Sequence, residues 1–278
     1  MLMSVESKIR LPFMKMHGLG NDFVVVDGRD SRIELTGSLI AAVADRHRGV
    51  GFDQLAVILP SNVDAHLDFY NSDGSKSAAC GNATRCIARF LMSETGKSTL
   101  NLKTDRGILH AVDQGDGITA VNMGHPMLNW NEVPLAHACD TLSLPIDGAP
   151  TATGMGNPHC TFFVDDAEQV NLEKRGSETE HNLLFPERTN VQFTSVIAPN
   201  HLRMRVWERG VGVTLASGSS SCATAVAAAR RGLTGRSVTI DLDGGQIKVD
   251  WRDDGVWMAG PTAHVFDGVF TVEFLAGV

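Results

Sequence analysis

The chain has 278 residues, of which 43% are hydrophobic and 20% are charged. Its mean hydropathy is −0.03, which is typical of a globular chain and excludes the disordered, collagen-like and membrane-spanning classes. The formal net charge is −8, from 24 basic and 32 acidic residues. This balance argues against nucleic acid or an anionic membrane as a partner, so we expect a small-molecule ligand.

Two further features bear on location. The five cysteines are odd in number and unevenly spaced, which predicts free thiols in a reducing compartment. Glu6 and Lys8 interrupt the first ten residues, where a signal peptide would have its apolar core. We therefore expect a cytoplasmic protein with neither a leader nor a spanning helix.

The sequence contains an internal duplication. Five segments of the first half recur in the same order 136 to 138 positions later. The matched pairs are Gly20-Asn21 with Gly156-Asn157, Gln54 with Asn190, Asn71 with Glu208, Cys80-Gly81-Asn82 with Ser217-Gly218-Ser219, and Gly107 with Gly245. Because the offset is close to half the chain, we predict two related halves that face each other across a pseudo-twofold axis.

Local patterns assign similar elements to both halves. In the first, apolar spacing predicts a helix over 36–47 with Thr36 as its N-cap, and another from Asn82 to just before Gly96. Alternating or β-branched runs predict strands at 23–26, 54–59, 67–70, 99–103, 108–112 and 118–123. In the second, we predict an Ala-rich helix from Ser219 or Ser220 to Gly232, and strands at 238–242, 246–251 and 256–258.

These patterns divide the chain into an N-terminal half, 1–125, and a C-terminal half, 126–261. The segment 262–278 lies beyond the second copy, and its run 269–274 has strand character. We expect this segment to return as a strand and complete the sheet of the N-terminal half.

The duplication also predicts a cleft with chemical groups on both sides. Cys80 and Ser217 each stand just before a helix start, so the backbone N–H groups of Gly81, Asn82, Gly218 and Ser219 could bind one carboxylate. A helix N-terminus lowers a thiol pKa from about 8.5, which predicts Cys80 as a base near neutral pH. An acid/base group on each side of an α-carbon is the arrangement that inversion of a stereocentre requires.

Other chemistries lack their motifs. The sequence has no His-Glu-x-x-His, no Cys-x-x-Cys, no complete dinucleotide fingerprint and no P-loop, so we predict neither a metal nor a cofactor. Ser217 does not lie in Gly-x-Ser-x-Gly, which weakens a hydrolase interpretation. His159 could also be a solvated loop histidine, and Glu208-Arg209 could be a surface ion pair.

Six blocks resemble the signature blocks of the diaminopimelate epimerases. They occur in that family's order over about residues 12–270: Lys15–Phe23, Gly51–Gln54, Asn71–Gly74, Cys80–Asn82, Gly156–His159 and Glu208–Gly212. The resemblance implies an α+β fold of two pseudo-symmetric domains, each a mostly antiparallel sheet wrapped around a central helix. It also implies a homodimer and a cofactor-independent, two-base interconversion of L,L- and meso-diaminopimelate, which supplies lysine and cell-wall precursors.

The resemblance further implies roles for the residues of the cleft. Cys80 and Ser217 hold the catalytic positions, and His159 and Glu208 adjust their protonation. Gly81, Asn82, Gly218 and Ser219 bind the carboxylate at the reacting centre. The remaining substrate-binding residues are Asn21, Gln54, Asn71, Asn157, Asn190, Glu208 and Arg209. Arg209 suits the distal carboxylate because a guanidinium can bind a carboxylate through two hydrogen bonds.

The sequence departs from the family at one catalytic position. Ser217 stands where the family has its second catalytic cysteine, and Val213 replaces an acidic residue common in that block. A serine hydroxyl is a weaker acid than a thiol and needs a neighbouring base. Two alternatives therefore stay open beside the epimerase: a related one-base racemase or lyase for another amino acid, and a weakly active or inactive amino-acid-binding homologue.

Overall fold

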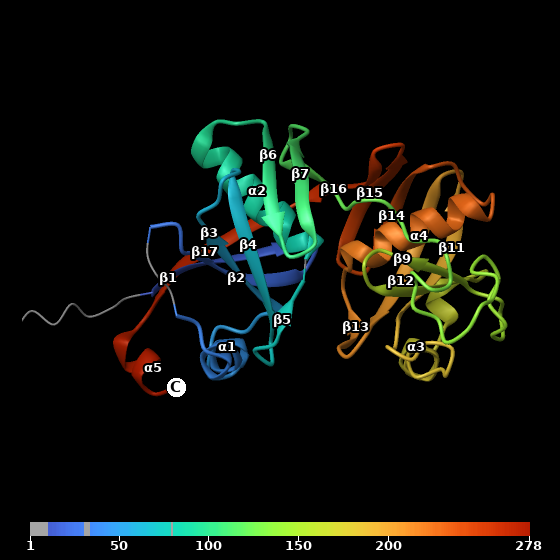
Figure 1. The fold of residues 1–278 in the computed structure, drawn as a ribbon, viewed down its shortest axis with the longest axis horizontal. Helices are drawn as coiled ribbons and strands as arrows, with labels where there is room; N and C mark the ends of the chain where they lie inside the picture. The colour runs from blue at the N-terminus through green and yellow to red at the C-terminus, as the bar shows by residue number, and fades with distance from the viewer. Residues whose placement is uncertain (1–10, 31–33, 79) are drawn as a thin grey trace, which may run out of the picture.

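The computed structural model describes residues 11–30, 34–78 and 80–278; Glu6 and Lys8 lie outside these ranges. The chain forms two lobes that lie side by side, with the N-terminal half on the left of Figure 1 and the C-terminal half on the right. All strands of the described residues belong to one 17-stranded sheet. None of the helices in the described ranges combines the length and apolarity that a membrane crossing needs.

The elements of the N-terminal half follow the predicted order. Its strands are β1 (Leu11–Gly18), β2 (Asn21–Asp27), β3 (Gln54–Leu59), β4 (Ala65–Asn71), β5 (Lys76–Ser77), β6 (Thr99–Thr104), β7 (Gly107–Asp113) and β8 (Ile118–Asn122). Its helices are α1 (Gly37–Ala44) and α2 (Gly81–Thr95). Thr36 caps α1 as predicted, but α1 ends at Ala44 and not at His47. Asp45 leaves the helical conformation, and its carboxylate accepts hydrogen bonds from the N–H groups of His47 and Arg48.

The C-terminal half repeats this scheme. Its strands are β9 (Thr151–Gly154), β10 (Pro158–Phe163), β11 (Asn190–Ala198), β12 (His201–Glu208), β13 (Gly212–Thr214), β14 (Ser237–Leu242), β15 (Gly245–Arg252) and β16 (Gly255–Pro261). Its helices are the short 3₁₀ helix η1 (Ala167–Gln169), α3 (Leu172–Glu180) and α4 (Gly218–Arg230).

Strand pairing confirms the duplication. In the first half, β2 pairs parallel with β3, β3 antiparallel with β4, and β4 parallel with β6. The second half repeats these directions in β10–β11, β11–β12 and β12–β14. The register is also repeated, because Ala65 lies opposite Leu102 and its counterpart Leu202 lies opposite Ile240. Most pairings are antiparallel, as expected, with parallel pairs at equivalent places.

The two halves join through equivalent strands. β8 pairs antiparallel with its counterpart β16, and Ala120 lies opposite Ala259. An antiparallel pair of equivalent strands is what a twofold relation between the halves produces. The sheet therefore continues from one lobe into the other.

The C-terminal segment returns to the first lobe, but in a different form from the one predicted. Strand β17 (Ala263–Phe270) pairs antiparallel with β1. The prediction of a strand through 274 is wrong, because helix α5 (Val272–Ala276) follows. Thr271 Oγ1 accepts a hydrogen bond from the Phe274 N–H and starts this helix, and the Phe274 ring stacks on Phe270.

Each central helix lies in the apolar core. Cys86, Ile87 and Leu91 of α2 belong to the same buried cluster as Cys222 and Val226 of α4. Separate clusters contain the residues that pack with α1 and α3, which lie at the lower edge of the two lobes in Figure 1. The core thus fixes the N-termini of α2 and α4 relative to each other, since both helices share it.

Candidate active site

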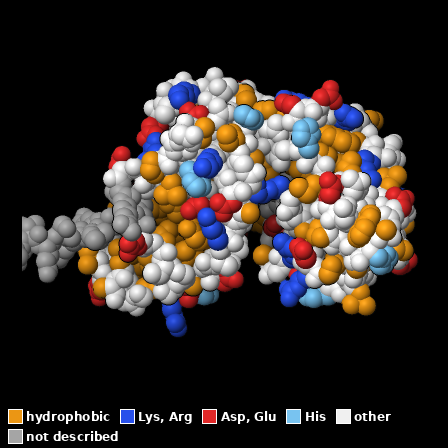
Figure 2. Space-filling model, viewed as in Figure 1, with side chains coloured by type: hydrophobic (Ala, Val, Ile, Leu, Met, Phe, Trp, Pro, Cys, Tyr) orange, Lys and Arg blue, Asp and Glu red, His pale blue; other side chains and the backbone are white. Residues whose placement is uncertain are grey.

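A cavity of about 510 Å³ lies between the halves and is lined by residues of both. Figure 2 shows the molecule hollowed between its two lobes, with charged side chains at the rim. The predicted residues that line the cavity are Asn21, Gln54, Asn71, Cys80, Gly81, Asn82, Asn157, Asn190, Glu208, Arg209, Ser217, Gly218 and Ser219. His159 is the one predicted site residue that does not.

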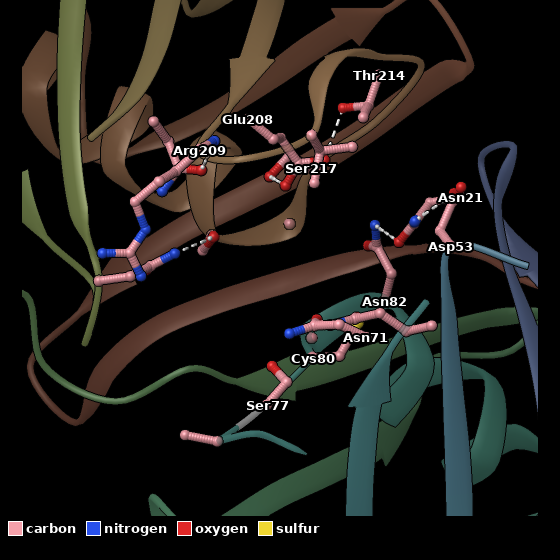
Figure 3. A pocket seen from close by; sticks show the side chains of 18 of the residues that line it. Asn21, Asp53, Asn71, Ser77, Cys80, Asn82, Glu208, Arg209, Thr214 and Ser217 are labelled. Carbon is pink, nitrogen blue, oxygen red and sulfur yellow. Dashed lines mark hydrogen bonds between the residues drawn. The ribbon is translucent and has the colours of Figure 1, made fainter. Parts of the chain in front are cut away.

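Cys80 and Ser217 occupy equivalent positions at the starts of the two central helices. Cys80 is the N-cap of α2 with φ −142° and ψ 109°, and Ser217 is the N-cap of α4 with φ −138° and ψ 118°. Figure 3 shows Cys80 on the side of the first half and Ser217 on the side of the second. Each is followed by a glycine whose N–H is among the free donors of a helix N-terminus. The cavity thus has an anion-binding helix start from each half.

The two side chains make different contacts. The Cys80 thiol accepts a hydrogen bond from the Ala83 N–H, with a donor–acceptor distance of 3.5 Å. The Ser217 hydroxyl makes no such cap and donates to Glu208 Oε2 at 2.8 Å. The Thr214 hydroxyl donates to the other oxygen, Glu208 Oε1, at 2.6 Å (Figure 3). Glu208 is therefore oriented by two hydroxyls, one of which is a candidate acid/base group.

The structure corrects the expected protonation of Cys80. Burial raises the pKa of its thiol to about 12, and the hydrogen bond from Ala83 only partly opposes this rise. Desolvation outweighs the helix N-terminus here because a thiolate loses more from the missing water than it gains from one long hydrogen bond. Cys80 is consequently a thiol at neutral pH, which suits it to donate a proton. Burial likewise raises the pKa of Glu208, against the two hydroxyl hydrogen bonds.

His159 lies behind the cavity wall. It is fully buried, and its Nε2 lies 2.9 Å from Asn157 Oδ1. Its Nδ1 faces the amide nitrogen of Gln192 at 3.1 Å. Burial, and then the charges of Arg209 and Arg106, lower its pKa to about 3, so the ring is neutral. Within this structure His159 therefore orients the carboxamide of Asn157 and does not face the cavity.

Asparagine side chains connect each helix start to a neighbouring strand. Asn82 Nδ2 donates to Asn21 Oδ1 at 3.1 Å, and Asn21 Nδ2 donates to Asp53 at 2.7 Å (Figure 3). Arg85, which is fully buried, donates to Asn82 Oδ1 at 2.8 Å. In the other half the counterpart contact joins Asn157 Nδ2 to Ser219 Oγ at 3.5 Å. The same pair of positions is linked in both halves, as the duplication predicts.

The cavity wall also carries amides and a guanidinium from both halves. Gln54 Nε2 donates to Asn71 Oδ1 at 3.0 Å. Asn190 donates through Nδ2 to the Pro158 carbonyl and accepts through Oδ1 from the Arg209 backbone N–H, both at 3.0 Å. Arg209 Nη1 donates to the carbonyl of Glu187. Together these amides and the guanidinium offer donors for a carboxylate and acceptors for an ammonium group.

Sequence reasoning missed several residues of the cavity wall. Those with polar side chains are Arg46, Asp53, Ser72, Ser77, Arg106 and Thr214. Asp53 and Ser72 stand next to predicted residues, in the blocks that contain Gln54 and Asn71. Arg106 had no such signal, because it reaches the cavity from the turn between β6 and β7.

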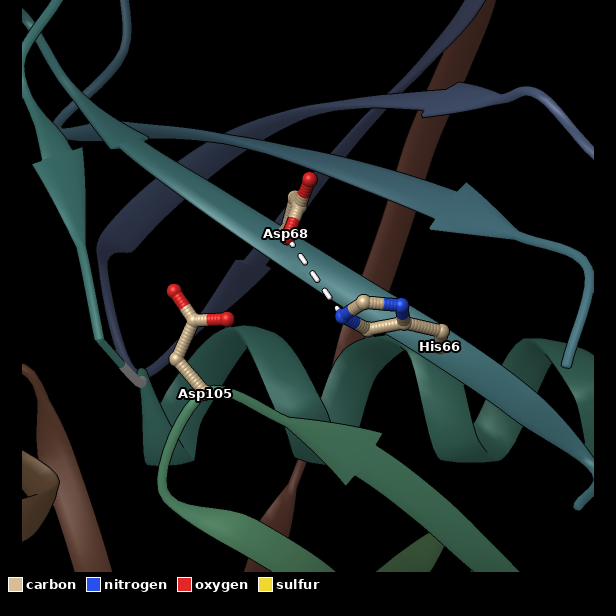
Figure 4. A group of neighbouring side chains, drawn as sticks. All are labelled: His66, Asp68 and Asp105. Atoms are coloured by element: carbon tan, nitrogen blue, oxygen red, sulfur yellow. Dashed lines mark ion pairs between the residues drawn. The ribbon is translucent and has the colours of Figure 1, made fainter.

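One further group of titratable residues lies outside the cavity wall. The ligand atoms of His66, Asp68 and Asp105 lie within 4.8 Å of one another (Figure 4). The ammonium group of Lys76 lies 3.0 Å from a carboxylate oxygen of Asp68 and 3.0 Å from one of Asp105. Lys76 already supplies the positive charge of this cluster, and we assign no metal to it.

Comparison with known proteins agrees with this geometry. The structure is similar to that of a hydroxyproline epimerase from Agrobacterium vitis, with a TM-score of 0.66, 13% identity, and 94% of this chain and 92% of that chain covered. It is also similar to a phenazine biosynthesis protein from Bacillus anthracis, with a TM-score of 0.69, 14% identity, and coverages of 94% and 99%. At these identities the likeness shows the fold alone, which is the duplicated fold found among epimerases.

Sequence similarity is more specific. The profile of the family described as diaminopimelate epimerase matches residues 13–128 and 151–265. The diaminopimelate epimerases of Rhodospirillum centenum and Acidiphilium cryptum are each 49% identical to this chain. The first alignment covers 95% of this chain and 94% of the relative, and the second covers 95% and 98%. The chain belongs to the diaminopimelate epimerase family.

Proposed function

We propose that this protein interconverts L,L- and meso-diaminopimelate by moving a proton between the two faces of one α-carbon. The observation that carries the proposal is the placement of Cys80 and Ser217 at equivalent helix starts of one cavity. The relatives named for this activity align over nearly the whole chain.

The α-carboxylate binds at the two helix starts. The N–H groups of Gly81, Asn82, Gly218 and Ser219 point their partial positive charge at it. As the α-proton leaves, negative charge develops on the α-carbon and delocalises into this carboxylate. Donors that are already in place stabilise this charge without reorganisation.

Ser217 and Glu208 act together on one face. The Ser217 oxygen takes the α-proton while its own hydroxyl proton moves to Glu208, which already accepts it in a hydrogen bond of 2.8 Å. On the other face Cys80 donates its S–H proton to the carbanion. One C–H bond breaks and one forms, and the enzyme is left with a Cys80 thiolate and a protonated Glu208. Proton exchange with solvent, or the reverse reaction, restores the starting state.

The contact between Ser217 and Glu208 favours this epimerase over the two alternatives. A one-base enzyme or a binding protein would not need a carboxylate on the hydroxyl of Ser217. The experiment is to incubate L,L-diaminopimelate with the protein and with its Cys80→Ala variant, and to separate the stereoisomers chromatographically. Formation of the meso isomer that depends on Cys80 supports the proposal. Absence of meso product with the unaltered protein contradicts it.

The remaining parts of the proposal concern cofactors, location and domains. Helix starts and hydroxyls supply the electrostatics, so we propose that neither a metal nor an organic cofactor takes part, which dialysis against a chelator tests. We propose a cytoplasmic enzyme, on the grounds of its unpaired cysteines and composition. The segments 1–125 with 262–278, and 126–261, are proposed as its two domains, joined at the β8–β16 pair.

A second copy of the chain is the proposed partner. On β17 the side chains of Val265, Phe266 and Val269 are exposed. An apolar groove lined by Pro12, Phe13, Phe90 and Val269, among others, adjoins them. Exposed apolar side chains beside such a groove are typical of a subunit interface. Val269→Asp should convert a dimer to a monomer in analytical ultracentrifugation, and a wild-type monomer at micromolar concentration would contradict the proposal.

A further inference from the structure

Arg106 crosses from one half of the molecule to the other. It belongs to the turn between β6 and β7 of the N-terminal half, and it lines the cavity together with Gly156 of the C-terminal half. Its guanidinium lies so close to Gly156 that a methyl group at that position would be 2.0 Å from Arg106 Cζ. Gly156 also has φ +81°, which favours glycine. The backbone at Gly156 thus leaves the space that this guanidinium fills.

Among the described residues, no Asp or Glu oxygen lies within 4.0 Å of the guanidinium of Arg106. An acidic residue next to it in the sequence and another in the cavity wall pair with other cations. The neighbouring Asp105 pairs with Lys76, and Asp53 pairs with Arg46. Arg106 therefore lines the cavity with a positive charge that no carboxylate of the described residues neutralises, and this charge can bind an anionic ligand.

Arg209 is in the same situation on the other side. It comes from the C-terminal half, and among the described residues its guanidinium donates to a backbone carbonyl, that of Glu187. Both guanidiniums act on His159, whose pKa each of them lowers. The guanidinium of Arg106 lies against Gly156, the residue before Asn157, and Arg106, Asn157 and Arg209 all line the same cavity.

We propose that Arg106 is a specificity-determining residue that binds the distal carboxylate of the substrate jointly with Arg209, one guanidinium from each half. The proposal rests on the proposed function for the identity of the substrate, which has a second carboxylate. Two guanidiniums on one carboxylate give directed, charge-assisted hydrogen bonds to both oxygens. An amino acid without the distal carboxylate leaves both cations unbalanced, so the enzyme selects against it.

The test compares two ligands and two variants. L,L-diaminopimelate has the distal carboxylate, and L-lysine is the same molecule without it. Arg106→Gln removes the guanidinium charge and keeps a polar side chain. Lys103→Gln is the matched control, because Lys103 lies on the same hairpin, is exposed and does not line the cavity. Dissociation constants are measured by calorimetry for both ligands, and α-proton exchange in deuterated water is followed in parallel.

We expect Arg106→Gln to raise the dissociation constant of L,L-diaminopimelate at least about tenfold and to change that of L-lysine by less than about twofold. The reason is that a charge-assisted contact is lost only with the first ligand. Lys103→Gln should bind both ligands with the dissociation constants of the wild type. Equal weakening of both ligands, or an Arg106→Gln variant that matches Lys103→Gln, overturns the assignment. A wild-type protein that binds L,L-diaminopimelate but does not exchange its α-proton overturns only the proposed function. Failure to bind it at all overturns both.

Discussion

The Ser217 hydroxyl donates a hydrogen bond of 2.8 Å to Glu208, whereas its counterpart Cys80 accepts one from the backbone of its own helix. The duplication places the two residues equivalently, yet only one of them has a carboxylate partner. A serine needs such a partner to exchange its proton, because its hydroxyl does not ionise near neutral pH on its own. The contact therefore supports the proposed role of Ser217 as a proton carrier.

Replacing Ser217 by Cys should raise the rate of inversion about tenfold or more. A thiol at this helix start is a much stronger acid than a hydroxyl and transfers its proton with a lower barrier. Ser217→Ala should lower the rate by at least about a hundredfold, since it removes the proton carrier. Initial rates of meso-isomer formation check both. A Ser217→Ala variant with the wild-type rate would show that another group accepts the α-proton.

The acid side of the pH–rate profile should depend on Glu208. Burial raises its pKa above the usual 4.5. Only the ionised form can accept the proton of Ser217, so activity should fall as the pH is lowered through this raised pKa. Glu208→Gln should reduce the rate by about a hundredfold or more and remove this acid limb. The measurement is kcat as a function of pH for the wild type and for Glu208→Gln. If the fall of kcat at acid pH is the same in Glu208→Gln, a group other than Glu208 causes it.

Cys80 should react slowly with iodoacetamide at neutral pH. Its pKa of about 12 leaves little thiolate, so its alkylation rate should rise about tenfold per pH unit between pH 7 and 10. Cys139 is partly exposed and should be labelled first at pH 7. Peptide mapping by mass spectrometry distinguishes the two sites, and loss of activity should follow the labelling of Cys80. Fast labelling of Cys80 at pH 7 would show that its thiolate is stabilised.

His159 should make stability depend on pH in a defined direction. Its pKa is about 3 in the folded protein, below the usual 6.5, so the unfolded chain takes up a proton that the folded chain does not. The contribution of His159 to the free energy of unfolding is fully present above pH 6.5. It decreases by about 1.4 kcal/mol per pH unit as the pH falls below 6.5. In urea unfolding, the free energy of unfolding should decrease from pH 7 to pH 5 by about 2 kcal/mol more in the wild type than in His159→Gln. Equal losses would contradict the buried, neutral ring.

The sequence was sufficient for the features that depend on local chemistry and on the duplication. Thr36 and Gly96 mark helix ends through their own capping geometry, and the matched segments indicated which residues would share a cleft. Features that depend on packing were not accessible in this way. The pKa of Cys80 is set by burial from both halves, and His159 lies behind Asn157 because its strand β10 is buried. Arg106 reaches the cavity only through the hairpin that carries it.

In the proposed mechanism two unlike acid/base groups, Cys80 on one face and Ser217 with Glu208 on the other, move the α-proton. Deuterium incorporation and inversion are followed together in deuterated water, starting from L,L- and from meso-diaminopimelate, with the wild type and Ser217→Cys. We expect one diastereomer to exchange its α-proton faster than it inverts and the other to exchange slowly, and we expect Ser217→Cys to reduce this difference between the two exchange rates. Equal and fast inversion of both diastereomers by the wild type, with no gain in Ser217→Cys, would contradict it.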